Sequence, residues 1–266
     1  MTSLQTPAFT QVDATDLEGQ IRALVRESLT HPAVHHPFLT SFASGEYADA
    51  FGVMRQYALE YSGYASWFPH YLRSVIRRLE RQDHRLLLLR NLEEERGQLD
   101  EDDCQALRGV GIDPNAILGI PHPVLFRRFC HAIGLSDQDL SQPTEAAREW
   151  RTAFLDYLSQ ATEAEAVGAL GLGTEHIVRP VYEHLLAGIR RIGVLKRDDY
   201  VFFELHCLVD DQHQQDLLTI AKELASTRPD GVGELRRGMQ KALDLRCEFW
   251  NKLAANVDRQ RRARIA

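Results

Sequence analysis

The sequence predicts an all-α protein, and three observations support that prediction. Apolar residues recur with the 3.6-residue period of an amphipathic helix along nearly the whole chain, whereas the alternation typical of β-strands is scarce. The connections between the periodic segments are short, which favours antiparallel neighbours in a helical bundle. The chain has 266 residues, of which 44% are hydrophobic, so it can fold around one core without disulfides or a structural metal. We therefore expect a single domain, 1–266, built as a bundle of about seven to eight helices.

The first half of the chain is expected to contain three helices. A helix over 13–29 begins with a possible aspartate cap and carries apolar residues at helical spacing. The stretch HPAVHHPF, residues 31–38, is expected to be a loop because two prolines punctuate it. A long, aromatic-rich helix over 46–79 should be kinked or interrupted at Pro69, and a shorter helix over 83–97 should stop at its final glycine.

The second half is expected to contain an insertion and five further helices. Residues 98–120 are acidic and rich in turn-forming residues, so we expect an inserted, irregular loop with at most a helical turn. One helix should bend near Gly171, Gly173 and Pro180, and the basic tail over 260–266 is expected to fray. The helices are expected over 122–134, 145–159, 163–192, 197–225 and 233–259.

Composition excludes several classes of protein. The formal net charge is −7 and there is no long basic block, which argues against nucleic acid or an anionic membrane as the main partner. The four cysteines lie far apart and form no CxxC pair, so neither a thiolate zinc site nor a disulfide framework is expected. The first residues lack the pattern of a signal peptide, and no apolar run approaches the roughly 20 residues that span a bilayer. We expect a cytoplasmic protein.

The stretch HCLVDDQH carries three possible metal ligands on one helix. His206, Asp210 and His213 are four and three residues apart, so a helix places them on one face. Imidazole and carboxylate suit zinc, manganese or iron, and iron is favoured where coordination positions stay open for oxygen chemistry. Such a spacing also arises by chance on an exposed helix. Here it follows Phe202 and Phe203, and buried polar side chains need partners that a metal would supply.

One helix cannot complete such a site, and three other stretches offer ligands. GTEHIV contains Glu175, NLEEERG contains three glutamates over 93–95, and PHPVLFRRF contains His122 at a helix start. Each has a simpler explanation. The glutamates can be surface charge, His122 can be a capping residue, and Glu175 can pair with Arg179 one helical turn later.

Taken together, these stretches resemble the haem-oxygenase-like diiron oxidases and oxygenases, also called iron-containing redox enzymes. The resemblance runs over about residues 31–218 and follows one order: HPFLTSFASGEYADAFGVMRQYALEYSGYASWFPHYL, RNLEEERG, HPVLFRRFCHAIGLSDQDL, GLGTEHIVRPVYEHLL and FFELHCLVDDQHQQDLL. It implies a haem-oxygenase-like bundle, related in fold to pyrroloquinoline quinone synthase and thiaminase-type proteins. The ordered set is far more specific than any one of its members.

The resemblance also implies a site for two Fe(II) ions, with O2 as co-substrate. The family's first glutamate ligand corresponds to Glu95, with Glu94 as the alternative. The family usually has a histidine shortly after this glutamate, whereas here 98–120 intervene; we expect an insertion whose ends come together. The implied ligands are Glu95, His122, Glu175, His206, Asp210 and His213, all except His122 also being catalytic candidates. Substrate contacts are expected from Tyr57, Glu60, Tyr61 and Tyr64.

The activity implied by the resemblance is oxidation of a small metabolite by dioxygen in a biosynthetic pathway for natural products. An amine or amino acid is the favoured substrate, by N-oxygenation or oxidative fragmentation, with an external electron donor as a possible partner. Oxidative decarboxylation or C–C cleavage of a fatty or other carboxylic acid is the first alternative. A metal-free enzyme or a binding protein of the same fold is the second. A homodimer is expected because folds of this type commonly dimerise.

Overall fold

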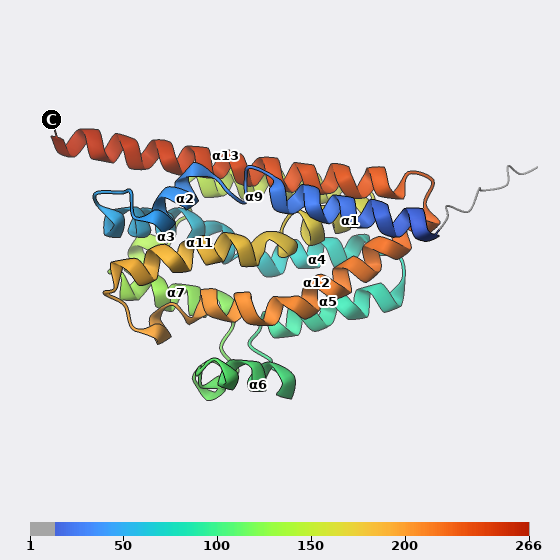
Figure 1. Cartoon of the computed structure of the whole chain (residues 1–266), viewed down its shortest axis with the longest axis horizontal. Coiled ribbons are helices and arrows are strands. Elements are labelled where there is room, and N and C mark those ends of the chain that lie inside the picture. Colours follow the sequence, from blue (N-terminus) through green and yellow to red (C-terminus); the bar gives the residue numbers. More distant parts are fainter. Residues whose placement is uncertain (1–13, 266) are drawn as a thin grey trace, which may run out of the picture.

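Helices account for the regular structure of the described chain. The computed structural model describes residues 14–265, apart from the side chains of 14–15, 209–212, 261 and 263–265. Within that range there is no β-strand, and the helices lie roughly along one axis of an elongated bundle (Figure 1). The all-α prediction is confirmed.

The α-helices are α1 (Ala14–Thr30), α2 (Pro37–Ser44), α3 (Ala50–Ala65), α4 (Phe68–Arg78), α5 (Gln82–Glu94), α6 (Glu101–Gly109), α7 (His122–Ala132), α8 (Asp137–Leu140), α9 (Glu145–Gln160), α10 (Glu163–Val167), α11 (Val178–Ile192), α12 (Val201–Thr227) and α13 (Gly231–Ile265). Short 3₁₀ turns occur at η1 (Pro114–Ala116), η3 (Glu175–Ile177) and η4 (Arg197–Asp199), and a π-helical turn at η2 (Gly168–Leu172). None of the described helices has the length and apolar character required to cross a bilayer.

The long aromatic segment breaks where its proline predicts. Helix α3 ends at Ala65 and α4 starts at Phe68, so Pro69 falls in the first turn of α4. A proline is tolerated there because the first turn of a helix has no intrahelical acceptor for its N–H.

The expected bend in 163–192 is a complete change of helix type. The chain passes from α10 through η2 and η3 before α11 begins. A Cβ atom on Gly168 would lie 2.1 Å from the Leu235 carbonyl oxygen, and one on Gly173 would lie 2.7 Å from the Ala242 Cβ. The two glycines therefore let α13 approach this segment closely. As a result, Thr174 and Glu175 turn into the bundle, where both are buried.

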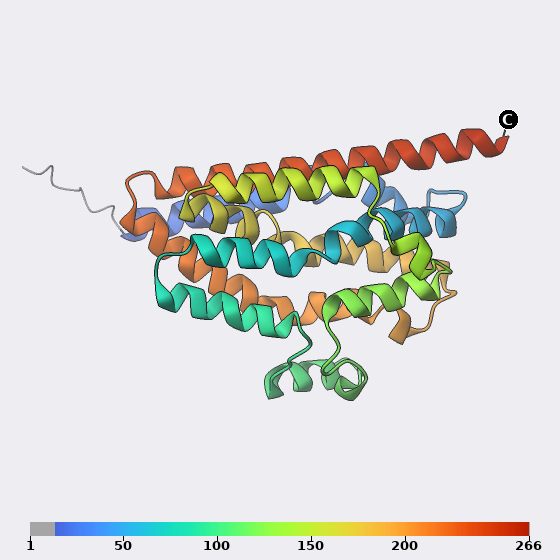
Figure 2. The same cartoon turned by 180° about the vertical axis from the view of Figure 1, so that it is seen from behind.

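The insertion 98–120 is more regular than expected. It contains α6, whose first turn is closed by a capping box between Asp100 and Asp103, and it projects from one side of the bundle (Figures 1 and 2). Its two ends do return to one place. The Gly119 N–H donates to the Gly97 carbonyl at 2.8 Å, and the His122 N–H donates to the Glu95 carbonyl at 3.0 Å.

Two other expectations about local structure were wrong. The loop expected over 31–38 ends early, because Pro37 starts α2 and the His36 side chain accepts the N–H of Phe38 as an N-cap. The tail over 260–266 does not fray within the described part, since α13 continues to Ile265 and extends beyond the other helices (Figure 1). Arginine, glutamine and alanine are good helix formers, and no glycine or proline interrupts them.

Candidate metal centre

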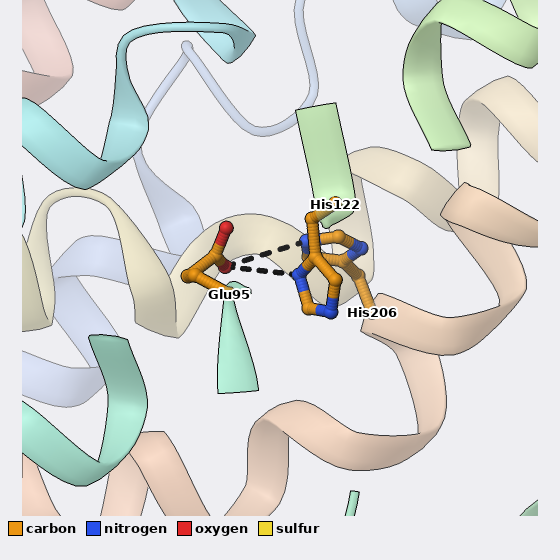
Figure 3. Close-up of side chains that lie close together, drawn as sticks. All are labelled: Glu95, His122 and His206. Carbon is orange, nitrogen blue, oxygen red and sulfur yellow. Dashed lines mark hydrogen bonds and ion pairs between the residues drawn. The ribbon is translucent and has the colours of Figure 1, made fainter. Parts of the chain in front are cut away.

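Three possible ligands from three elements meet inside the bundle. Glu95 caps the end of α5, His122 is the first residue of α7, and His206 lies in the second turn of α12. One ligand atom from each lies within 4.8 Å of the other two, and all three residues are buried. In Figure 3 both imidazoles face the same carboxylate oxygen, Oε1 of Glu95, at 3.1 Å from His122 Nδ1 and 3.9 Å from His206 Nε2. The backbone bond between Glu95 and His122 fixes this approach across the insertion.

The His206 ring is held in a tautomer suited to a metal ligand. Its Nδ1 donates to the carbonyl of Phe202 at 2.7 Å, which leaves Nε2 with a lone pair directed towards Glu95. Burial lowers the pKa of His206 to about 3, and the nearby His122 lowers it in the same direction. The imidazole is therefore neutral at physiological pH, as a metal ligand must be.

His122 contributes a buried ring nitrogen that forms no hydrogen bond with the described residues. Its ring packs edge-on against the His206 ring, with the centroids 4.7 Å apart. While Nδ1 faces Glu95, the buried Nε2 atom has no hydrogen-bond partner among the described residues. A buried nitrogen without a partner costs free energy unless a ligand or ion contacts it.

Two buried carboxyl groups line the same cavity and respond oppositely to it. Burial raises the pKa of Glu95, but the adjacent His122 and the other imidazoles lower it by more. The net result is a pKa below the ordinary value. Burial also raises the pKa of Glu175, and the charge on Glu95 adds to that increase. Glu175 accepts a hydrogen bond from Asn91 Nδ2 at 3.2 Å. Two carboxylates that raise each other's pKa are ionised together more easily when a cation lies near both.

The remaining predicted ligands lie further along α12. His213 is buried, and its Nε2 contacts Oε2 of Glu94. Both glutamates considered for the first ligand position thus face a histidine: Glu95 faces His122 and His206, and Glu94 faces His213. The side chain of Asp210 lies outside the described residues, so its role as a ligand stays a prediction.

The predicted substrate residues divide into two pairs. Tyr61 and Tyr64 line the cavity that also contains Glu95, His122, Glu175 and His206. Tyr57 does not; it lies in the aromatic core against Tyr61, Phe203 and Trp250.

Glu60 lies outside that cavity too. Its carboxylate accepts hydrogen bonds from Gln56, Thr144 and Asn256, and it borders a different hollow at the surface. The expectation that Tyr57 and Glu60 line the substrate cavity is therefore corrected. On α3, Tyr57 and Glu60 lie one turn before Tyr61 and Tyr64 respectively, so both are displaced along the helix axis from the residues that line the cavity.

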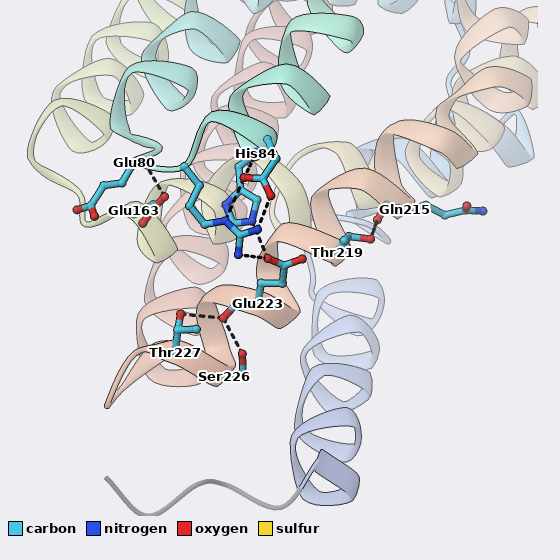
Figure 4. Close-up of polar contacts among 10 residues, drawn as sticks. Glu80, His84, Glu163, Gln215, Thr219, Glu223, Ser226 and Thr227 are labelled. Carbon is cyan, nitrogen blue, oxygen red and sulfur yellow. Dashed lines mark hydrogen bonds and ion pairs between the residues drawn. The ribbon is translucent and has the colours of Figure 1, made fainter. Parts of the chain in front are cut away.

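A second group of possible ligands has a different character. Asp83, His84 and Glu223 also bring ligand atoms within 4.8 Å of one another, but Asp83 is exposed. The Arg81 guanidinium already bridges Asp83 and Glu223. His84 Nε2 lies 3.0 Å from Glu223 Oε2, and Figure 4 shows the two side chains facing each other. An arginine supplies the positive charge here, so this group ties α5 to α12 without an ion.

Sequence reasoning missed three residues of the central cavity. Asn91 orients Glu175 by a hydrogen bond. It lies in RNLEEERG, the stretch already singled out for its glutamates, and that proximity was the available signal. Tyr182 lines the cavity and shares a 3.0 Å hydrogen bond with the Tyr61 hydroxyl. Arg246 lines it as well and is only 3% exposed. Its position three residues after Leu243 and four before Trp250 places it on the apolar face of α13, which was the available signal.

The donor set fits a divalent transition metal. It consists of buried imidazole nitrogens and carboxylate oxygens, one of the imidazoles is fixed as a neutral tautomer by a backbone carbonyl, and His122 Nε2 is buried without a partner. Oxygen and nitrogen ligands without thiolate are those that iron and manganese accept readily. No rearrangement of the helices is needed to bring Glu95, His122 and His206 together.

Comparisons with known proteins agree with this assignment at the level of family and fold. A family model described as "iron-containing redox enzyme" matches residues 55–247, well over half of the chain. A search of the curated proteins finds no match.

Several solved structures share the fold at low sequence identity. A TenA homologue from Pseudomonas syringae pv. tomato is 14% identical, with a TM-score of 0.68 over 95% of this chain and 100% of its own. A domain of unknown function with a haem-oxygenase-like fold from Shewanella denitrificans is 15% identical, with a TM-score of 0.66 over 93% and 94%. A CADD-like protein of unknown function from Nostoc punctiforme is 17% identical, with a TM-score of 0.69 over 92% and 98%. These likenesses establish a haem-oxygenase-like fold.

Proposed function

The chain belongs to the iron-containing redox enzyme family, and on that basis we propose that it is a non-haem diiron oxidoreductase that uses dioxygen to oxidise a small metabolite. The observation that supports this most strongly is the convergence of Glu95, His122 and His206 within 4.8 Å, with Glu175 on the wall of the same cavity. Such a set of carboxylates and histidines on facing helices is typical of diiron sites in helical bundles.

The ligands divide naturally between two ions. Glu95, His122 and His206 would hold one iron. His213 would hold the other together with Asp210. Glu175 would be a further ligand, since the charges of both His213 and Glu95 affect its pKa. Glu94, which contacts His213, is available as a further carboxylate at this second position.

Bound ferrous iron would supply the electrons and the open coordination positions for activating dioxygen. The protein residues set the conditions for that chemistry. The Phe202 carbonyl keeps His206 Nε2 free to bind a metal, and Asn91 orients the Glu175 carboxyl group. Burial raises the pKa of Glu175, and a bound cation would oppose that shift by stabilising its carboxylate.

The aromatic walls of the cavity limit its contact with solvent. Phe202 and Tyr182 are at most a few per cent exposed, and Tyr61 is equally buried. Exclusion of water protects a reactive oxidant from side reactions and strengthens the electrostatic interactions inside the site.

We propose an amine or amino acid as the substrate, by N-oxygenation or oxidative fragmentation. In N-oxygenation of a primary amine, one oxygen atom of O2 enters an N–H bond to give a hydroxylamine, and the other leaves as water. This consumes two electrons and two protons beyond those of the amine, so an external two-electron donor is part of the proposal. Oxidative decarboxylation of a carboxylic acid is the second candidate, favoured by the buried Arg246 on the cavity wall.

The test is oxygen consumption by the protein after anaerobic loading with ferrous iron. Panels of amines, amino acids and fatty acids are added with a chemical reductant, and the visible spectrum is followed after mixing with oxygen. We expect at least one class to accelerate oxygen uptake and to change the lifetime of a transient absorption. The opposite result is uptake of no more than trace iron, with oxygen consumption unchanged when His206 and His213 are replaced. That result would show that the protein is a metal-free enzyme or a binding protein of this fold.

Three further expectations are part of the same proposal. The enzyme acts in the cytoplasm, in a biosynthetic pathway, and as a homodimer. Its partners are small molecules and an electron donor, with no role for nucleic acid or membrane, in keeping with the net charge of −7.

A further inference from the structure

Arg246 is a buried cation without a carboxylate partner among the described side chains. It lies in α13, is 3% exposed, and forms no ion pair with any side chain that the structure describes. The carboxylates on the same cavity wall are engaged elsewhere: Glu95 faces His122, and Glu175 accepts from Asn91. Buried charges in proteins are normally paired, because an unpaired one loses its hydration without compensation.

The contacts that Arg246 does make leave its charge intact. Its Nη2 donates to the Tyr64 hydroxyl at 3.2 Å, and its guanidinium lies 4.8 Å from the centre of the Trp150 ring. Burial raises the pKa of Tyr64 well above its ordinary value, so this phenol is neutral and does not balance the guanidinium. The buried Nε atom of Arg246 has no hydrogen-bond partner among the described residues. A guanidinium held by aromatic faces with a donor unused is ready to receive a planar anion.

The position of this cation links it to the candidate metal centre. Arg246, Tyr64, Glu175 and His206 all line one cavity, whose volume is about 30 Å³. That volume holds a water molecule or two, or a group about as small as a carboxylate. A larger ligand must extend beyond it.

A second cavity lies next to the first. It has a volume of about 270 Å³, and Pro123 lines both cavities. The charged groups among its described lining residues are Arg127 and Arg151, both positive. Arg151 lies over the Trp67 ring at 4.1 Å, and Arg127 is 4.0 Å from the exposed Asp137. A cavity lined by positive charge attracts an anion more strongly than a cation.

We propose that the substrate of this enzyme carries a carboxylate group, which pairs with the Arg246 guanidinium inside the cavity that the candidate iron ligands line. The inference rests on the proposed function for the identity of the reaction, but not for the binding itself. It favours amino acids and other carboxylic acids as substrates and excludes simple amines that lack an acid group. Arg246 would fix one end of the substrate and so determine which of its atoms faces the metal ligands.

The test is calorimetric titration of the full-length, metal-free chain with matched probes. Hexanoate and L-norleucine carry a carboxylate, hexanamide replaces it with a neutral amide, and hexylamine has no acid group. We expect both acids to bind the wild-type protein at least about tenfold more tightly than hexanamide or hexylamine, because only a carboxylate adds a negative charge and two equivalent oxygens that can accept parallel bonds from a guanidinium.

Variants then locate the binding to one residue. Arg246→Met should weaken hexanoate binding by at least about tenfold, and Arg246→Lys by several-fold, since an ammonium keeps the charge but loses the planar fork. Arg22→Met, which removes an exposed arginine paired with Glu18, should bind hexanoate as the wild type does. If Arg246→Met does not fold, the Lys variant and the wild-type comparison of acid with amide decide the question.

Several results would overturn the proposal. They are equal binding of hexanoate and hexanamide, wild-type affinity for hexanoate in folded Arg246 variants, no binding of either acid at millimolar concentration, or competition by chloride or phosphate as effective as by hexanoate. The last would identify a structural site for inorganic anions. Iron analysis of the same preparations separates the two hypotheses: bound iron without acid binding removes only this inference, and acid binding without iron removes only the diiron assignment.

Discussion

His206 and Phe202 are joined by a hydrogen bond within one turn of α12, from the imidazole Nδ1 to the main-chain carbonyl at 2.7 Å. The bond selects the tautomer of a buried ring whose other nitrogen faces Glu95 across 3.9 Å. Such backbone contacts orient metal-binding histidines in many proteins. The local helix therefore prepares His206 for a ligand before any ion arrives, and this preparation can be measured in the metal-free protein.

The buried neutral imidazole predicts how the stability of the metal-free protein depends on pH. The pKa of His206 is about 3 in the folded chain and about 6.5 when the chain unfolds. The unfolded state therefore binds a proton that the folded state does not. The contribution of His206 to the free energy of unfolding is therefore fully present above pH 6.5. It is lost as the pH falls from 6.5 towards 3, by up to about 1.4 kcal/mol per pH unit.

Denaturant titrations of the metal-free chain between pH 7 and 4.5 measure that dependence. In His206→Gln, unfolding should take up about one proton fewer, so the free energy of unfolding should fall less steeply as the pH decreases. A variant whose free energy of unfolding falls as steeply as that of the wild type would contradict a buried neutral His206.

Metal binding should stabilise the fold through the central cluster and not through the second group. At a free metal concentration about 100 times the Kd, binding adds about 2.7 kcal/mol, which raises the Tm by roughly 5–10 °C in a chain of this size. His122→Gln should abolish most of that increase with anaerobic Fe(II) or with Mn(II). His84→Gln is the matched control, because the Arg81 guanidinium already neutralises its neighbours. An equal loss of the metal-induced increase in both variants would count against the site.

Gly97 should be required for the geometry at Glu95. Its φ is +91°, and a Cβ there would lie 2.5 Å from the Ile120 backbone nitrogen, at the point where the insertion closes. Gly97→Ala should lower the free energy of unfolding by more than about 1 kcal/mol and weaken iron binding. Gly119→Ala is the control, since its φ is +75° but no atom lies within 4 Å of the new Cβ. Equal effects of the two substitutions in thermal denaturation and iron binding would show that the close approach is unimportant.

Glu60 should stabilise the fold without taking part in the reaction. Its carboxylate accepts bonds from Thr144 at 2.6 Å, Asn256 at 2.7 Å and Gln56 at 2.8 Å, and so connects α3 to α13 and to the start of α9. Glu60→Ala leaves these donors without their shared acceptor and should cost about 1–3 kcal/mol in denaturant unfolding. Iron content and oxygen uptake should stay unchanged. A variant of normal stability with altered turnover would restore Glu60 as a substrate residue.

The sequence supported the helical architecture and the position of the central cluster for physical reasons. Helical spacing brings the residues of HCLVDDQH to one face whatever surrounds them, and α12 bears this out for His206 and His213, both of which are buried. The closure of the insertion was also predictable, because the ends of a long loop can meet at little entropic cost.

Other features depend on contacts between distant parts of the chain. Whether Glu60 faces a substrate or a hydrogen-bond network is decided by Thr144 and Asn256, which lie far from it in sequence. Arg246 shares the apolar face of α13 with Leu243 and Trp250, yet an arginine on a long helix is ordinarily exposed. Its burial becomes clear only when Tyr64 and Trp150 from α3 and α9 are placed around it.

The most direct test of the iron assignment is the iron content of the chain after anaerobic loading with Fe(II) and desalting, for the wild type and for Glu95→Gln. Glutamine keeps the size of the side chain but removes the charge that faces His122 and His206. We predict two equivalents of iron in the wild type and at least one fewer in the variant, with circular dichroism showing that both are folded. Only trace iron in the wild type, or equal iron in both proteins, would contradict a diiron centre built on Glu95.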